Sequence, residues 1–101
     1  MPGAREVIVS LPAHVDIAHL VPLRALLARA ATEERRTLVV DFSAVTSIDT
    51  SCLAVLVGVQ RQAVDAGRTL VLRRVDGITR ALLESSGLDL VFEIEELDPA
   101  A

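Results

Sequence analysis

The stretch TLVVDFSAVTSIDTSCLAVLVGVQRQAVDAGRTLVLRRV, Thr37 to Val75, predicts a strand, a turn, a helix and a second strand in succession. Its first six residues, Thr37–Phe42, form a short and mostly apolar run that is typical of a strand buried on both faces. Residues 51–66 are predicted to form a helix, and Gly67 is expected to end it. The run from Arg68 to Val75 predicts the second strand. Two strands joined by such a helix favour a parallel pair with a right-handed crossover.

The preceding segment also predicts a strand followed by a helix. Residues 5–12 are β-branched and alternate polar with apolar side chains, so they predict a strand that is closed by Pro12. Residues 20–32 repeat leucine at helical spacing, and Pro22 is compatible with the first turn of a helix there.

The segment that follows the second strand predicts one more helix. It spans residues 76–87, with Asp76 as the N-cap. The apolar residues expected on its packed face are Ile78, Leu82 and Leu83. Residues 88–97 supply a final short strand or helical turn, and residues 98–101 are expected to be a disordered tail. This order of elements predicts a single α/β domain, residues 1–101, with a largely parallel sheet.

Composition excludes several classes of protein. About half of the 101 residues are apolar, which allows one packed core, and the only aromatic residues are Phe42 and Phe92. The net charge of −4, with no lysine, disfavours nucleic-acid binding. A single cysteine excludes a disulfide framework. The longest apolar run, Leu53–Val59, is too short to span a bilayer and no basic-then-apolar leader follows Met1, so a cytoplasmic protein without membrane insertion is expected.

The turn before the central helix is the main candidate for function. Three polar residues come between the predicted buried strand and the start of the helix, namely Asp49, Thr50 and Ser51. In α/β folds, many functional sites lie at the carboxyl ends of parallel strands. Serine, threonine and aspartate are also the preferred N-cap residues, so any one of the three can serve only to start the helix. The remaining interpretations are a nucleophile, an anion cradle at the helix N-terminus, and a hydroxyl that another protein modifies.

The helix surface that follows Ser51 is small and partly apolar rather than charged. At helical spacing this face carries Ser51, Ala54, Val55, Gly58, Gln62 and Asp65. The opposite side carries the residues that are expected to cover the sheet, namely Leu53, Leu56, Val57, Gln60 and Val64. A smooth face beside a hydroxyl suits close approach by another protein. Tight packing against a neighbouring helix of the same domain is the competing interpretation.

Enzymatic interpretations of this turn are weak. No G-x-S-x-G elbow surrounds Ser51, and only His14 and His19 are available as a base for a triad with Asp49. His14, Asp16 and His19 lack a fourth metal ligand, and both histidines are expected to be solvated loop residues. No Gly-rich phosphate loop occurs. We therefore expect neither an enzyme nor a bound cofactor or metal.

Residues 38–94 resemble the STAS domain of bacterial anti-sigma factor antagonists. Asp16 also matches the aspartate at the family's entry to its first helix. The matching motifs are Asp41-Phe42-Ser43, Asp49-Thr50-Ser51-Cys52-Leu53, Gly67, Thr69–Leu72, and Ser86-Gly87-Leu88 with Phe92. The resemblance implies a mixed, mostly parallel sheet of about four strands that is flanked by about four α-helices.

The resemblance also implies a phosphorylation switch. Residue for residue, the acceptor is Ser51, with Thr50 as an alternative acceptor, and the kinase is a partner anti-sigma factor with a histidine-kinase-like ATPase fold. The unmodified protein would bind that anti-sigma factor and free a sigma factor, and a PP2C-type phosphatase would reset it. A monomer or weak dimer is expected. The residues expected to contact the partner are Asp16, Asp49, Thr50, Ser51, Cys52, Ala54, Val55, Gly58 and Gln62.

Two features depart from the family pattern. Cys52 stands where the family usually has glycine, and its side chain is expected to restrict the approach of a kinase to Ser51. The chain begins only a few residues before its first clear strand, so the short N-terminal strand common in the family is expected to be missing or reduced. The alternative function is a STAS subunit that docks without phosphorylation, in a phospholipid-transport ABC complex or a signalling assembly.

Overall fold

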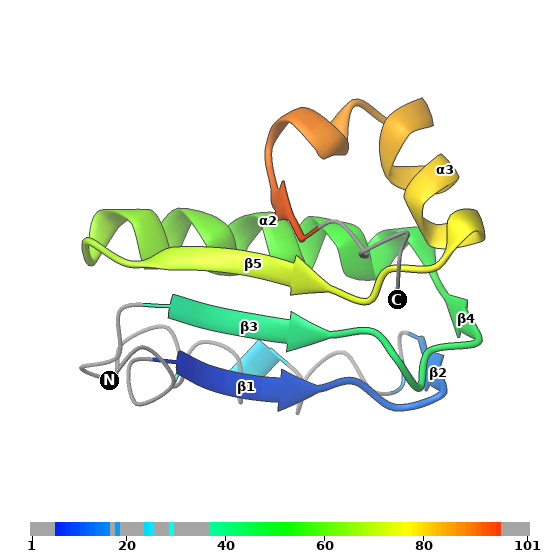
Figure 1. The fold of residues 1–101 in the computed structure, drawn as a ribbon, viewed down its shortest axis with the longest axis horizontal. Coiled ribbons are helices and arrows are strands. Elements are labelled where there is room, and N and C mark those ends of the chain that lie inside the picture. The colour runs from blue at the N-terminus through cyan, green and yellow to red at the C-terminus, as the bar shows by residue number, and fades with distance from the viewer. Residues whose placement is uncertain (1–5, 17, 19–23, 26–28, 30–36, 96–101) are drawn as a thin grey trace, which may run out of the picture.

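A computed structural model describes residues 6–16, 18, 24–25, 29 and 37–95 of the chain (Figure 1). The elements in chain order are β1 (Glu6–Ser10), β2 (His14–Val15), β3 (Thr37–Asp41), β4 (Ser47–Ile48), α2 (Thr50–Asp65), β5 (Thr69–Arg73), α3 (Gly77–Ser85), the 3-10 helix η2 (Leu88–Leu90) and β6 (Glu93–Ile94). The central strand–helix–strand unit is therefore confirmed to within two residues at each boundary.

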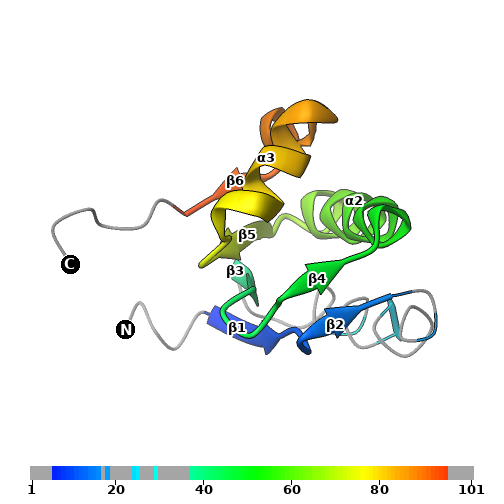
Figure 2. The ribbon, with the colours of Figure 1, turned by 90° about the vertical axis from the view of Figure 1, so that its right-hand side faces the viewer.

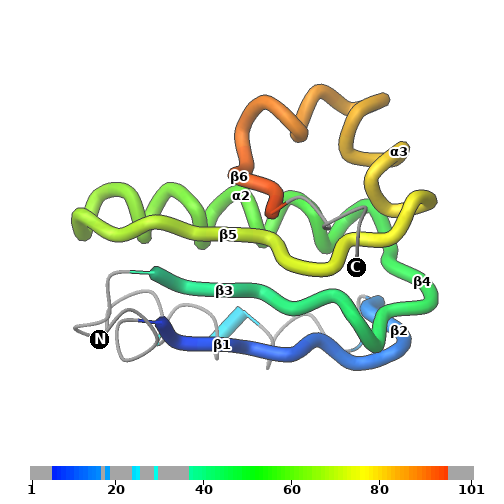
Figure 3. The backbone as a smooth tube through the Cα atoms, in the orientation of Figure 1, coloured from blue at the N-terminus to red at the C-terminus, as the bar shows by residue number. Residues whose placement is uncertain are grey.

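Four strands form one sheet in the order β1-β3-β5-β6. Every pair in it is parallel, and the register places Val9 beside Val40 and Val40 beside Leu72. The prediction of a mostly parallel sheet of about four strands is thus confirmed, and every strand pair in the described residues is parallel. The crossover from β3 to β5 passes through β4 and α2 (Figure 3), so α2 begins at the carboxyl ends of the strands. The two-residue strands β2 and β4 form a separate parallel pair at that end.

The core lies between α2 and one face of the sheet (Figure 2). Helix α2 buries a stripe of five residues there: Cys52, Leu53, Leu56, Val59 and Ala63. Leu53 and Leu56 were predicted on this side, but Val64 was predicted there wrongly, because it is 56% exposed. At 100° per residue, Val64 lies about 100° around the helix from the centre of the buried stripe.

Helix α3 packs through two of the three residues expected, Leu82 and Leu83, but not through Ile78. Its N-cap is Asp76, as predicted, and the carboxylate accepts a hydrogen bond of 2.7 Å from the backbone N–H of Thr79. Thr79 and Leu83 are buried and Leu82 is half-buried, whereas Ile78 is 83% exposed. The prediction that Ile78 packs inward is wrong, since one turn of this short helix meets the core through Thr79 instead.

Several predictions fall wholly or largely outside the described residues. These are the helix at residues 20–32, the reduced N-terminal strand and the tail at residues 98–101. About four helices were expected, and the elements whose bounds are described include two α-helices and one 3-10 helix, while the described residues 18, 24, 25 and 29 are helical as well. The last described segment, predicted as a strand or a helical turn, contains both.

Candidate functional site

The turn that carries Ser51 is fixed by the β2–β4 pair. Val15 of β2 lies beside Ile48 of β4, and the carbonyl of Val15 accepts a 2.8 Å hydrogen bond from the N–H of Asp49. Helix α2 starts at the next residue, at the carboxyl end of the sheet (Figure 1). The residues before the helix are therefore held by backbone bonds, to which Thr46 adds a side-chain hydrogen bond of 3.1 Å to the carbonyl of Ala13.

Asp49 is the residue that caps α2. Its backbone is extended, its carboxylate lies 3.4 Å from the N–H of Ser51, and its carbonyl accepts a 2.9 Å bond from the N–H of Cys52. Ser51 occupies the second helical position and is exposed. Of the three candidate caps in the sequence, the cap is thus Asp49, and the Ser51 hydroxyl is left on the surface.

Cys52 points into the core and not toward a partner. It is 1% exposed, and its Sγ donates to the carbonyl of Val15 at 3.6 Å. Burial raises the pKa of the thiol, and the negative charges of Asp49 and Asp16 raise it further. The expected crowding of Ser51 by this side chain is therefore wrong, and Cys52 does not belong to the contact surface.

We expect the Cys52 thiol to react slowly in the folded protein, because it is buried and its pKa is raised. Alkylation by iodoacetamide at pH 8 should be slower than that of a free thiol by on the order of tenfold or more, and 8 M urea should remove the difference. The matched variant is Ser51→Cys in a Cys52→Ala background, whose thiol should react rapidly. Equal rates for the two folded proteins would contradict the burial of residue 52 and the exposure of residue 51.

Two carboxylates meet at the start of α2. Asp16 directly follows β2, is half-buried, and lies close enough to Cys52 for its charge to act on the thiol together with that of Asp49. Because Val15 pairs with Ile48, Asp16 and Asp49 follow neighbouring strands. This corner of the molecule is already anionic before any modification.

His14 lies near the turn but bonds elsewhere. It is exposed, as expected, although it stands on β2 and not in a loop, and its Nδ1 is 2.7 Å from the Oγ of Ser47. His19 lies outside the described residues. Among the residues that the structure describes, no group of three or more His, Cys, Asp or Glu side chains could hold a metal ion.

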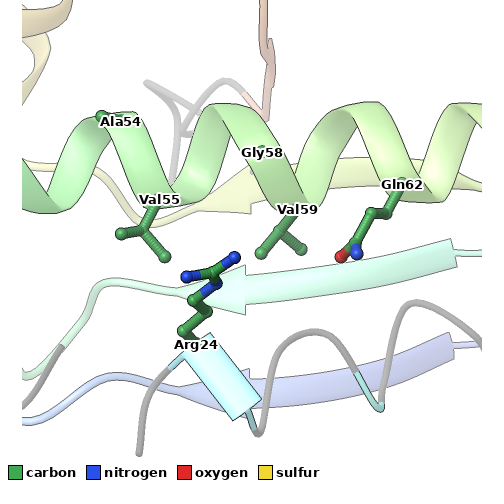
Figure 4. A pocket seen from close by; sticks show the side chains of 6 residues that line it. All are labelled: Arg24, Ala54, Val55, Gly58, Val59 and Gln62. Carbon is green, nitrogen blue, oxygen red and sulfur yellow. The ribbon is translucent and has the colours of Figure 1, made fainter. Parts of the chain in front are cut away.

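The face of α2 that continues from Ser51 borders a hollow of about 290 Å³ (Figure 4). It is lined by four predicted contact residues, Ala54, Val55, Gly58 and Gln62, and by Val59 and Arg24. Figure 4 shows the Arg24 side chain reaching toward Val55 and Val59. Arg24 was not among the predicted site residues, because the periodicity of residues 20–32 predicts a helix but not which of its polar side chains faces α2.

Gly58 lies on the same face of α2. Apart from the backbone of its own helix turn, no heavy atom of the described residues lies within 4 Å of the position that a Cβ at Gly58 would take. Close packing against the described part of the domain therefore does not require glycine here.

Comparison with known families decides the identity of the fold. The family model described as "Mlab, STAS domain" matches residues 3–94. The chain belongs to the STAS domain family. The resemblance stated from the sequence is thereby confirmed.

Solved structures with this STAS fold include three informative neighbours. TM1081 of Thermotoga maritima, described as an anti-sigma factor antagonist, is 19% identical, with a TM-score of 0.80 over 92% of this chain and 80% of that one. The anti-sigma factor antagonist SpoIIAA in its unphosphorylated form is 15% identical, with a TM-score of 0.72 over 93% and 82%. The Bacillus cell fate determinant SpoIIAA in its phosphorylated form is 18% identical, with a TM-score of 0.69 over 95% and 87%. Among curated proteins, none matches significantly.

The strand-end motif of this STAS domain, Asp41-Phe42-Ser43, has a structural role. The carboxylate of Asp41 accepts a 2.8 Å hydrogen bond from the N–H of Ser43, and this bond is the main reason that the pKa of Asp41 is lowered. Phe42 is buried in the core. The motif therefore turns the chain out of β3 toward β4 and the acceptor turn.

The helices that the structure describes include none that combines the length and the apolar character needed to cross a bilayer.

Proposed function

We propose that this STAS domain is an anti-sigma factor antagonist that is switched off by phosphorylation of Ser51. In the unmodified form it binds an anti-sigma factor that is also its serine kinase, and a sigma factor is released. The observation that carries the proposal is the exposed Ser51, which follows the capping residue Asp49 at the start of a helix face of mostly small residues.

The proposed switch acts by charge at the surface. A phosphate adds about −1.5 to −2 charges, and at the second helical position it meets the positive end of the helix macrodipole, so the fold is expected to accept it. Asp16 and Asp49 make the same corner strongly anionic after modification. Burying that charge against a partner without matching cations costs several kcal/mol, which lowers affinity by orders of magnitude.

The structural neighbours support this proposal. SpoIIAA has been solved in unphosphorylated and phosphorylated forms, and both forms share the fold of this chain. One STAS architecture is therefore compatible with both states in that protein. For this chain we propose a kinase with a histidine-kinase-like ATPase fold, a PP2C-type phosphatase that resets Ser51, and action in the cytoplasm, where ATP is available to the kinase.

Phosphate transfer tests the proposal directly. Purified histidine-kinase-like ATPases of the same genome are incubated with the protein and ATP, and the modified residue is mapped by mass spectrometry. We expect one phosphate on Ser51, which is lost in Ser51→Ala and retained in the neighbouring control Thr50→Ala. Modification that persists in Ser51→Ala and disappears in Thr50→Ala would move the acceptor to Thr50.

The second candidate function is docking without modification, as a subunit of a phospholipid-transport ABC complex or of a signalling assembly. The sequence feature behind it is that Cys52 replaces the glycine that usually follows the acceptor, and the burial of Cys52 weakens this support. Absence of phosphate transfer from every such kinase of the genome would favour this candidate over the switch.

A further inference from the structure

An apolar groove runs between α2 and the α3–η2 segment, next to the Ser51 face, with which it shares Ala54. Its volume is about 360 Å³. Leu53 and Val57 line it from α2, and Leu82 lines it from α3. The complete lining in the described residues is Thr50, Leu53, Ala54, Val57, Leu82, Ser86 and Leu88. The groove therefore starts at Thr50, the residue next to the proposed acceptor.

The helix that lines the groove through Leu82 also carries an isoleucine that the fold leaves in solvent. Ile78 is 83% exposed and stands one helical turn before Leu82, with the C-cap Ser86 one turn further on. Residues four apart lie on the same side of a helix, so these three positions follow one side of α3. An exposed isoleucine one turn from a groove-lining leucine favours an interaction surface.

Three carboxylates stand close in sequence to groove residues or to Ile78. Asp49 precedes Thr50, Asp76 stands two residues before Ile78, and Asp89 follows Leu88. Figures 1 and 3 show that the N-terminal ends of α2 and α3, where the two capping aspartates sit, lie at the same end of the molecule. On α2, the cation Arg61 lies one helical turn beyond the groove residue Val57. An occupant with positive charges beside its apolar side chains would complement the three carboxylates.

We propose that this groove binds an amphipathic helix of the partner kinase, with its apolar edge in the groove and arginines or lysines near the three carboxylates. The identity of the partner rests on the proposed function. Helices commonly bind in this way, with apolar anchors spaced by three and four residues. A helix that is seated against Thr50 brings the kinase to Ser51, one residue away. A second copy of this chain fits less well, because a symmetric contact would bring the same carboxylates together.

The groove is tested with designed peptides and does not require the kinase. The probe is a 14-residue peptide with leucine at spacings of three and four and arginine on both flanks, and its control carries glutamate in place of arginine. In methyl-labelled protein, the arginine peptide should shift the methyl signals of Leu53, Leu82 and Ile78. The methyl of Ile8, which is 53% exposed on β1 and outside the groove, should not move.

Matched variants distinguish binding in the groove from nonspecific binding of the peptide. Ile78→Ala should weaken binding of the arginine peptide by about tenfold, because a large apolar contact is lost, whereas Ile8→Ala should leave it unchanged. Asp49→Asn and Asp76→Asn keep a capping side chain and remove the charge, so each should weaken binding severalfold at low salt and much less at 0.5 M salt.

Three results would overturn the proposal: equal binding of the glutamate peptide, shifts outside the groove, or wild-type affinity in Ile78→Ala. Self-association that Ile78→Ala abolishes would assign the groove to a second copy and would overturn it as well. Phosphorylation of Ile78→Ala on Ser51 with wild-type kcat/KM would remove the groove from kinase docking and leave the proposed function standing. Conversely, arginine-peptide binding without any phosphate transfer would reject the switch while supporting the groove as a helix site.

Discussion

Replacing Ser51 by aspartate is expected to weaken binding of the partner kinase by roughly hundredfold or more, which corresponds to about 3 kcal/mol. The added carboxylate joins Asp49 and Asp16 in one corner of the contact surface, and a docked partner would have to desolvate it. Folding stability should stay within about 1 kcal/mol of wild type, because Ser51 is exposed and a negative charge is favourable in the first turn of a helix. Titration calorimetry gives the affinity, and urea unfolding gives the stability.

The control is Ser51→Asn, which has nearly the shape of aspartate without its charge. We expect Ser51→Asn to bind within a few fold of wild type, so that the difference between the two variants reports charge alone. An equal loss of kinase affinity in both variants would mean that the size of the side chain matters and not its charge. Unfolding of Ser51→Asp would show that the hydroxyl has a structural role, although Asp49 already caps the helix.

Truncating Leu56 to alanine is expected to lower the free energy of unfolding by about 2–5 kcal/mol. Leu56 lies at the centre of the α2 stripe, is 1% exposed, and packs in the cluster with Leu38, Val40 and Leu72 of the sheet. The loss is large for a domain of this size, whose total stability is about 5–15 kcal/mol. Since the chain contains no tryptophan or tyrosine, far-UV circular dichroism in urea is the suitable measurement.

Val64→Ala provides the comparison on the same helix. Val64 is 56% exposed, so its truncation should change stability by no more than about 0.5 kcal/mol. If Val64→Ala proved as harmful as Leu56→Ala, the side of α2 that covers the sheet would be assigned wrongly. The pair therefore tests the orientation of the helix that presents Ser51.

Much of the fold could be predicted because its signals are local. Strand β3 is apolar at each interior position, α2 is followed by a glycine with positive φ, and α3 starts at an aspartate cap. Helix orientation was harder to predict. Ile78 and Val64 are apolar by composition and yet exposed, because the buried stripes are set by the sheet position and include the small or polar residues Ala63 and Thr79. The two-residue strands β2 and β4 are too short to show a period.

Only part of the candidate site could be predicted, because the roles of its residues depend on geometry that the sequence does not define. Serine, threonine and aspartate are all good caps, so only the geometry shows that Asp49 takes this role and that Ser51 remains exposed. The inward direction of Cys52 follows from its place in the buried stripe, which a single sequence does not define. Arg24 and the α2–α3 groove arise from segments distant in sequence and carry no local motif.

The measurement that tests the central claim most directly is the affinity of the partner kinase, in its ADP-bound form, for the protein before and after stoichiometric phosphorylation of Ser51. We expect phosphorylation to reduce the affinity by at least hundredfold while the urea midpoint and the amide spectrum outside the start of α2 stay unchanged. Unchanged affinity, or a loss that is accompanied by unfolding of the domain, would contradict a switch that works by charge at an exposed serine.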